Sequence, residues 1–137
     1  MPKLLEREQD LWHVVFTGVF LLLIITTAYV FNYDFQVTAI RPFDFVILSL
    51  AVFRLIRLIT YDSVTECVRR YCSKFESGPR KTIFDLIDCP WCTGVWAALS
   101  VAILYFFVPS AMILIIVLAL AGAASSLQVI MWKIGRE

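Results

Sequence analysis

The feature that most constrains this chain is an apolar run without a formal charge, which extends over residues 12–31. About 20 helical residues cross the ~30 Å hydrocarbon core of a bilayer, because each residue adds about 1.5 Å of length. Three later runs approach this length, at residues 43–60, 91–108 and 110–132. We therefore predict an all-α integral membrane protein with four transmembrane helices at these positions.

The composition supports a bilayer as the main solvent. Hydrophobic residues make up 61% of the 137 residues and charged residues 17%, whereas soluble domains average about 45–50% and about 25%. The formal net charge is only +1, so the chain lacks the basic field that attracts nucleic acid. We expect one membrane domain over residues 1–137 that binds no nucleic acid. Its expected partners are the lipid bilayer and either a second copy of the chain or another membrane protein.

The first run also has some features of a cleaved signal peptide, because Lys3 and Arg7 precede it. A signal core is about 7–15 residues long and follows a basic segment. This run is longer, and Glu6, Glu8 and Asp10 make the preceding segment acidic as well as basic. We favour a retained span over cleavage.

The distribution of Lys and Arg predicts the orientation of the spans. The loop between the first two runs has only Arg41, and the turn between the last two has neither residue type. Because short cytoplasmic loops retain basic residues, we expect a multi-pass protein of the cell membrane with both termini in the cytoplasm. The basic residues on that side are Lys3, Arg7, Arg69, Arg70, Lys74, Arg80, Lys81, Lys133 and Arg136.

Residues 63–75 have the pattern of an amphipathic helix that lies in the cytoplasmic membrane interface. Ser63 and Glu66 have the spacing of a capping box, which predicts that the helix begins there. Two interpretations of its basic residues stay open. They either bind anionic lipid headgroups or form a solvated face that follows the positive-inside rule. These residues are Arg69, Arg70 and Lys74.

The four cysteines, Cys67, Cys72, Cys89 and Cys92, all fall on the predicted cytoplasmic side. Structural disulfides are disfavoured there because the compartment is reducing. Two pairs of closely spaced cysteines are typical of zinc sites, so a zinc-binding module is one alternative function. In a helix, however, Cys67 and Cys72 would point about 140° apart, which is poor geometry for one tetrahedral ion. We therefore expect no cofactor, with zinc as the alternative.

The sequence Cys89-Pro90-Trp91-Cys92 suggests a second chemistry. Pro90 suits the first position of a helix, which would place Cys89 at its N-cap. The exposed backbone N–H groups of a helix start can lower the pKa of a thiol and favour the reactive thiolate. A membrane thiol oxidoreductase that uses Cys89 and Cys92 is therefore a further alternative, although the βαβ context of thioredoxin-like enzymes is absent.

Two charges fall inside the second run. Arg54 and Arg57 are one helical turn apart and precede its expected end at Thr60. A charged side chain inside a membrane needs a partner or a water-filled cavity. Asp62 and Asp88 are the nearest carboxylates along the cytoplasmic side, so we expect an ionic cluster there. The alternative is that the two arginines bind lipid phosphate at the interface.

Small residues recur at every fourth position on the third and fourth runs. Gly94 begins one such series, and Gly122 with Ser126 belongs to another. Small residues let membrane helices approach closely. Because only a short turn around Pro109 separates the two runs, we expect these faces to meet in an antiparallel hairpin.

Four segments together resemble a known family. The chain is similar to the small bacterial membrane proteins of unknown function that include YjcA-like sporulation proteins of Gram-positive bacteria. The resemblance covers about residues 41–107 and implies an integral membrane protein, bacterial or phage-borne, that is sometimes linked to sporulation and has no established reaction. The segments are Arg41–Phe45, Phe53–Ile59, Asp62–Glu66 and Cys89–Trp96.

Taken together, the sequence favours a non-enzymatic membrane scaffold or partner-binding subunit. The alternatives are the thiol oxidoreductase and the zinc-binding module. Under the scaffold interpretation, the start of the third span has a structural role, in which a proline begins the helix, a tryptophan anchors it at the headgroups and a glycine admits a neighbouring helix. The structural candidates there are Pro90, Trp91, Gly94 and Trp96.

Overall fold

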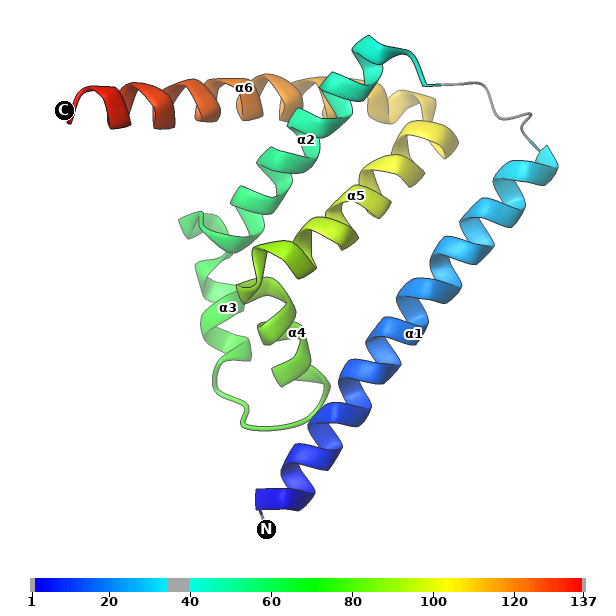
Figure 1. Cartoon of the computed structure of the whole chain (residues 1–137), viewed down its shortest axis with the longest axis vertical. Coiled ribbons are helices and arrows are strands. Elements are labelled where there is room, and N and C mark those ends of the chain that lie inside the picture. Colours follow the sequence, from blue (N-terminus) through cyan, green and yellow to red (C-terminus); the bar gives the residue numbers. More distant parts are fainter. Residues whose placement is uncertain (1, 35–39, 137) are drawn as a thin grey trace.

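Long helices form where the sequence is apolar. The computed structural model describes residues 2–34 and 40–136, and within these ranges the regular elements are all helical (Figure 1). Of the expected domain, Met1, residues 35–39 and Glu137 lie outside the described residues. The elements are α1 (Pro2–Asp34), α2 (Pro42–Thr60), the 3-10 turn η1 (Ser63–Thr65), α3 (Glu66–Cys72), α4 (Pro79–Asp88), α5 (Pro90–Phe107), the 3-10 turn η2 (Pro109–Ala111) and α6 (Met112–Ile134).

Proline and glycine set several of the helix boundaries. Pro42, Pro79 and Pro90 occupy the first turns of α2, α4 and α5, where a missing backbone N–H costs nothing. Gly78 precedes α4 with φ of 94°, a conformation that glycine adopts without the steric cost of a Cβ atom. Residues 73–78 form the loop that connects α3 to α4 (Figure 1).

The all-helical fold is confirmed, and three of the four expected spans are long and apolar enough to cross a membrane. These are residues Glu6–Tyr33, Pro90–Phe107 and Pro109–Ile134. The fourth expected span, α2, is fully helical but carries Asp44, Arg54 and Arg57. Most large hydrophobic side chains on α1 and α6 are exposed, as expected for helices with a lipid environment.

The core of the molecule lies where α2 meets α5 and α6. Ala51 of α2, Val101 of α5 and Ile115 and Ala119 of α6 are buried together. Leu50 contacts Gly122 and Arg54 contacts Ser125, so α2 and α6 run in the same direction where they cross. In Figure 1, α6 crosses α2 obliquely and diverges from α5 after the turn that joins them.

The predicted contact between the small faces of α5 and α6 is therefore wrong for both glycines. A Cβ atom on Gly122 would lie 2.4 Å from the carbonyl oxygen of Leu50, so α6 packs against the backbone of α2. A Cβ atom on Gly94 would lie 3.2 Å from Cδ1 of Ile56, also on α2. The reason is that η2 redirects α6 across α2.

The predicted amphipathic helix over residues 63–75 is wrong in its extent. Only Glu66–Cys72 is α-helical, and no side chain caps its start. The Thr65 hydroxyl instead lies 3.0 and 2.8 Å from the carbonyl oxygens of Leu58 and Ile59. These carbonyls at the end of α2 lack helical partners, so they compete for the donors of the next segment.

Helix α1 lies beside α4 and α5 and adds little to the core. Ring contacts join it to α5 at Phe20 and Trp96, with centroids 5.0 Å apart, and at Phe31 and Phe106, with centroids 4.3 Å apart. Its most apolar window has no residue buried inside the chain. The amino-terminal part of α1 is held by a different kind of contact, with α4.

Candidate functional site

Figure 1 shows that α1 and α5 begin, and α2 ends, near α3 and α4, and several polar side chains of these elements contact one another. They form two groups. The first, which we call the α1–α4 cluster, consists of Gln9, His13, Lys81, Thr82 and Asp85. The second, which we call the arginine pocket, is lined by Arg54, Arg57, Asp62, Ser125, Gln128, Val129 and Trp132.

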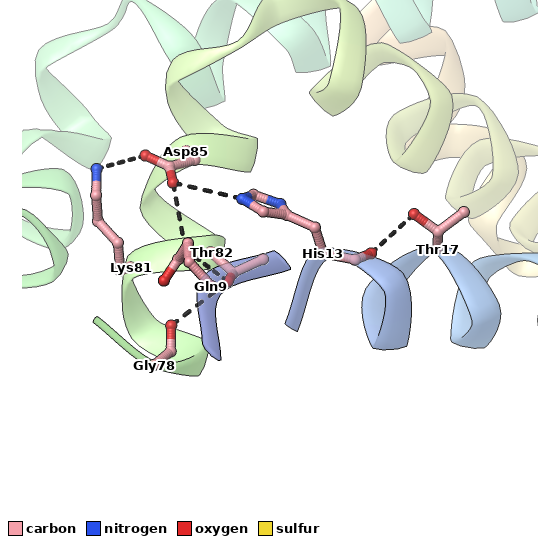
Figure 2. Close-up of polar contacts among 7 residues, drawn as sticks. All are labelled: Gln9, His13, Thr17, Gly78, Lys81, Thr82 and Asp85. Carbon is pink, nitrogen blue, oxygen red and sulfur yellow. Dashed lines mark hydrogen bonds and ion pairs between the residues drawn. The ribbon is translucent and has the colours of Figure 1, made fainter. Parts of the chain in front are cut away.

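Asp85 is the centre of the α1–α4 cluster (Figure 2). Its two carboxylate oxygens lie 2.5 Å from Nζ of Lys81 and 3.9 Å from Nε2 of His13. Gln9 Nε2 donates to the hydroxyl oxygen of Thr82 at 3.0 Å and lies 3.5 Å from Asp85. Gln9 and His13 are one turn apart on α1, so the cluster joins one face of α1 to one face of α4.

The sequence alone does not single out Asp85. Gln9 and Thr82 are 73 residues apart, so only the fold brings their helices together. The sequence signal was the spacing of polar residues four positions apart, which places Gln9 with His13 on one helix face and Lys81 with Asp85 on another. That spacing identifies a polar face but not its partner.

A cavity of about 390 Å³ adjoins this cluster between α1, α4 and α5. His13, Asp85, Cys92 and Trp96 are among its lining residues, and most of the others are apolar. Within the described residues, no hydrogen bond joins the Cys92 thiol to His13 or Asp85. The cavity therefore lacks the nucleophile–base contact of a hydrolytic or transferase site.

Both arginines of α2 line the arginine pocket, but their hydrogen-bond partners differ. Nη2 of Arg54 lies 2.9 Å from Oδ2 of Asp62, and Nη1 donates to the Ser125 hydroxyl at 3.2 Å. Nε of Arg57 is buried without a hydrogen-bond partner. Of the two carboxylates expected nearby, the structure brings Asp62 to Arg54. Among the described residues, Asp88 forms no ion pair with either arginine.

The basic residues of α3 have separate surroundings. The Arg69 guanidinium donates to the carbonyl oxygen of Thr60 at the end of α2. Arg70 forms an exposed ion pair with Glu66 at 2.5 Å, whereas Lys74 is exposed to solvent. Arg69 therefore satisfies the carboxyl end of a helix, and its cationic charge complements the dipole there.

The two cysteines at the start of α5 lie close together. The Cys89 sulfur is at the N-cap and accepts a hydrogen bond from the backbone N–H of Cys92 at 3.4 Å. A hydrogen bond from the Cys92 thiol, and then this backbone N–H, lower the pKa of the Cys89 thiol, while burial and the Asp88 carboxylate oppose the shift. Cys89 thus favours the thiolate form more than an ordinary thiol does.

Among the described residues, neither Cys67 nor Cys72 belongs to a group of side chains that could hold a metal ion. Cys67 is exposed and Cys72 is buried. Across residues 2–34 and 40–136, no group of three or more His, Cys, Asp or Glu side chains is placed to hold a metal ion.

At the start of α5, Trp91 is exposed, Gly94 faces α2 and Trp96 contacts α1.

Comparisons with known proteins place the chain in a family. The model of a family described as protein of unknown function (DUF1360) matches residues 70–131. UPF0713 protein YngL of Bacillus subtilis (strain 168) is 35% identical over 97 residues, which is 61% of this chain and 75% of YngL. Sporulation protein YjcA of the same strain is 33% identical over 112 residues, which is 69% of this chain and 95% of YjcA. The chain belongs to this uncharacterised family.

Family membership confirms the resemblance seen in the sequence. The DUF1360 match begins in α3 and ends in α6, so it contains Asp85, Cys89, Cys92 and Ser125. No solved structure matches the chain. The geometry of the two polar groups therefore has to carry the functional argument.

Proposed function

We propose that the chain is a four-span protein of the cell membrane that acts as a non-enzymatic scaffold or partner-binding subunit in a process connected with sporulation. The similarity to sporulation protein YjcA supports the process. The long apolar helices support the membrane location.

The packing of α2 supports a fourth span. Ala51 in its middle is fully buried, and α2 contacts both α5 and α6. Two of its charges have partners inside the bundle, because Asp44 accepts a hydrogen bond from the Tyr105 hydroxyl at 2.8 Å and Arg54 pairs with Asp62. Packing against two apolar spans, with these charges paired, supports the proposal that α2 is a fourth span.

The basic residues support the orientation. The region from α3 to α4 carries five Lys and Arg residues, and the start of α1 carries two more. Both regions lie at the same end of the bundle (Figure 1). By the positive-inside rule this end faces the cytoplasm. The N-terminus then lies on the cytoplasmic side. In Figure 1 the end of α6 lies away from α3 and α4, so the proposal that the C-terminus is also cytoplasmic is based on the basic residues Lys133 and Arg136.

The main support for a partner-binding role is the exposed apolar surface of α1. Within the chain, its apolar window buries no residue, and a Cβ atom on Gly18 would meet no atom within 4 Å. A glycine inside a helix costs about 1 kcal/mol relative to alanine, whereas it lets a neighbouring membrane helix approach closely. Gly18 thus marks a face where a partner helix fits.

The polar groups support a non-enzymatic role. Asp85 joins α1 to α4, and Arg54 joins α2 to α6, so the charges hold helices together. In the part of the chain that the structure describes, no serine, threonine or cysteine side chain is hydrogen bonded to an imidazole ring or a carboxylate group; the Thr17 hydroxyl donates to the backbone carbonyl of His13 and not to its ring. Such contacts are what activates a nucleophile in most hydrolases and transferases.

Thiol exchange is the second candidate, and the lowered pKa of Cys89 favours it. The Cys89 thiolate would attack a disulfide of a substrate protein and form a mixed disulfide. Cys92 would then displace the substrate thiol, so that the pair is oxidised to a disulfide while the substrate is reduced.

One experiment separates these roles. Strains that carry variants in place of the native chain are scored for sporulation efficiency, with protein level and Tm measured in parallel. The scaffold role predicts normal sporulation for Cys89→Ser with Cys92→Ser. It predicts a loss of several-fold for Gly18→Leu, because the added side chain blocks a partner without touching this chain. Loss through Cys89→Ser at normal Tm would establish thiol exchange instead, and normal sporulation with Gly18→Leu would remove α1 as the binding face.

A further inference from the structure

The arginine pocket is large enough for a small ligand. It has a volume of about 520 Å³ and lies between the carboxyl-terminal halves of α2 and α6. Pockets that bind small molecules span roughly 300–1,000 Å³. The pocket includes Ser125, which contacts Arg54, and extends to Trp132 on α6 and to Asp62, which lies between α2 and η1.

The charges that line the pocket do not balance. Arg54 and Arg57 contribute two positive charges, and Asp62 contributes one negative charge, which is already paired with Arg54 at 2.9 Å. The described residues offer Arg57 no carboxylate, so its positive charge at the pocket is not balanced. A guanidinium without an anionic partner favours a ligand with one negative charge and hydrogen-bond acceptors.

Further donors lie around the same space. Gln128 and Trp132 of α6 line the pocket with an amide and an indole N–H. The Arg136 guanidinium lies over the Trp132 ring, with Cζ 4.2 Å from the ring centroid, and adds a positive charge nearby. Guanidinium groups match the paired oxygens of phosphate and can bind them with two hydrogen bonds.

The surface of α6 beside the pocket is apolar and exposed, as in a surface that contacts lipid. The α6 residues beside it include Val129, Ile130 and Met131, which are 44%, 53% and 68% exposed. Trp132 is 64% exposed, and tryptophan is enriched at the level of lipid headgroups. If the phosphate group of a lipid bound in the pocket, the acyl chains of that lipid would lie against an apolar face of α6.

We propose that the arginine pocket binds the singly charged phosphodiester of an anionic lipid, with Arg57 as the main ligand. Arg54 is a positioning residue, because Asp62 and Ser125 hold its guanidinium at the wall of the pocket. This site is separate from the α1 face proposed for a protein partner, and either can fail without the other.

The test uses the full chain purified in a neutral detergent. Phosphatidylglycerol, phosphatidylcholine and inorganic phosphate are added separately, and the shift in Tm is measured for the wild type, Arg57→Gln and Arg7→Gln. Arg7→Gln removes the same group from an exposed position on α1 and is the matched control. Phosphatidylglycerol should raise the Tm of the wild type and of the control, and Arg57→Gln should reduce that shift by at least half.

The other lipids decide the remaining outcomes. Phosphatidylcholine has no net charge and should give a smaller shift that does not depend on Arg57. An equal effect of phosphatidylglycerol on all three proteins would overturn the site, and an equal effect of inorganic phosphate would overturn the lipid as its source. If Arg57→Gln does not fold, a photoreactive phosphatidylglycerol is used with the wild type. It should label residues 125–132, and labelling confined to other helices would contradict the proposal.

Discussion

Gly122 is the residue on which the packing of α6 against α2 most depends. A Cβ atom there would lie 2.4 Å from the carbonyl oxygen of Leu50 and 3.1 Å from its carbonyl carbon. A backbone carbonyl in a helix cannot move aside as a flexible side chain does. We therefore expect Gly122→Ala to push α6 away from α2 and to cost about 1–3 kcal/mol, measured as a lower Tm in detergent.

Two other glycines provide matched controls. A Cβ atom on Gly94 would meet only the end of the Ile56 side chain, at 3.2 Å, which can move. Gly18 has no atom within 4 Å of that position. Gly94→Ala should therefore be nearly neutral, and Gly18→Ala should be neutral or stabilising by up to about 1 kcal/mol through helix propensity. Equal losses at all three positions would contradict the packing described for Gly122.

Cys89 is partly exposed, and its thiol should react at lower pH than that of exposed Cys67. The hydrogen bond from the Cys92 thiol lowers the pKa of Cys89, so its thiolate persists to lower pH than that of an ordinary cysteine. Alkylation at Cys89, followed by mass spectrometry across a pH series, should reach half its maximal rate at a lower pH than alkylation at exposed Cys67.

A variant checks the cause of this shift. The Asp88 carboxylate opposes the lowering of the Cys89 pKa, so Asp88→Asn should move the alkylation profile of Cys89 further toward low pH. A profile for Cys89 that coincides with that of Cys67 would show that the helix start does not activate the thiol.

At the scale of elements, Arg54 ties the end of α2 to the following turn and to α6. Its side chain is 24% exposed and that of Asp62 is 27% exposed, so the pair is partly shielded from water. Arg54→Leu should cost about 1–3 kcal/mol because the Asp62 carboxylate loses its partner. Combining it with Asp62→Asn should recover about 1 kcal/mol in a double-mutant cycle measured by thermal or denaturant unfolding.

Arg57 supplies the comparison for this cycle. It has the same charge and lies one turn further along α2, but Asp62 pairs with Arg54. Arg57→Leu and Asp62→Asn should therefore have additive effects. A coupling free energy between Asp62 and Arg57, and none between Asp62 and Arg54, would show that Asp62 pairs with Arg57 and would contradict the ion pair described above.

The elements also show what the sequence could and could not predict. The bounds of α2, α5 and α6 follow from local signals, namely apolar length and a proline near the start of each helix or its preceding turn. The extent of α3 does not, because the end of α2 takes Thr65 and Arg69 as hydrogen-bond donors. Local pattern could not anticipate an acceptor that belongs to another element.

The candidate site divides in the same way. Arg54 and Asp62 are close in sequence, and both were expected near one end of a span, so their proximity could be proposed from the chain alone. The contact of His13 with Asp85 depends on how α1 lies against α4, which no spacing in the sequence specifies. The direction of α6 is equally non-local, because it depends on the turn η2 and on the fit of Gly122 to α2.

At the scale of the whole molecule, apolar and polar surfaces are segregated. The long helices expose apolar side chains along their length, while the ion pairs and hydrogen bonds of Asp85, Arg54 and Arg69 join the start of α1, the end of α2 and the segments α3 and α4. These segments lie near one another in Figure 1. A bilayer accounts for this arrangement, because it solvates the apolar faces and leaves the charged end in water. The orientation of that end in the membrane determines which residues face the cytoplasm.

Thiol labelling in intact cells measures this orientation. The native Cys67 and Cys92 are exposed in the region expected in the cytoplasm. A membrane-impermeant maleimide should label them only after permeabilisation. In a background without native cysteines, exposed Arg41→Cys should be labelled in intact cells because it precedes α2 on the opposite side. Labelling of Cys67 or Cys92 in intact cells, or protection of Arg41→Cys, would contradict the four-span orientation.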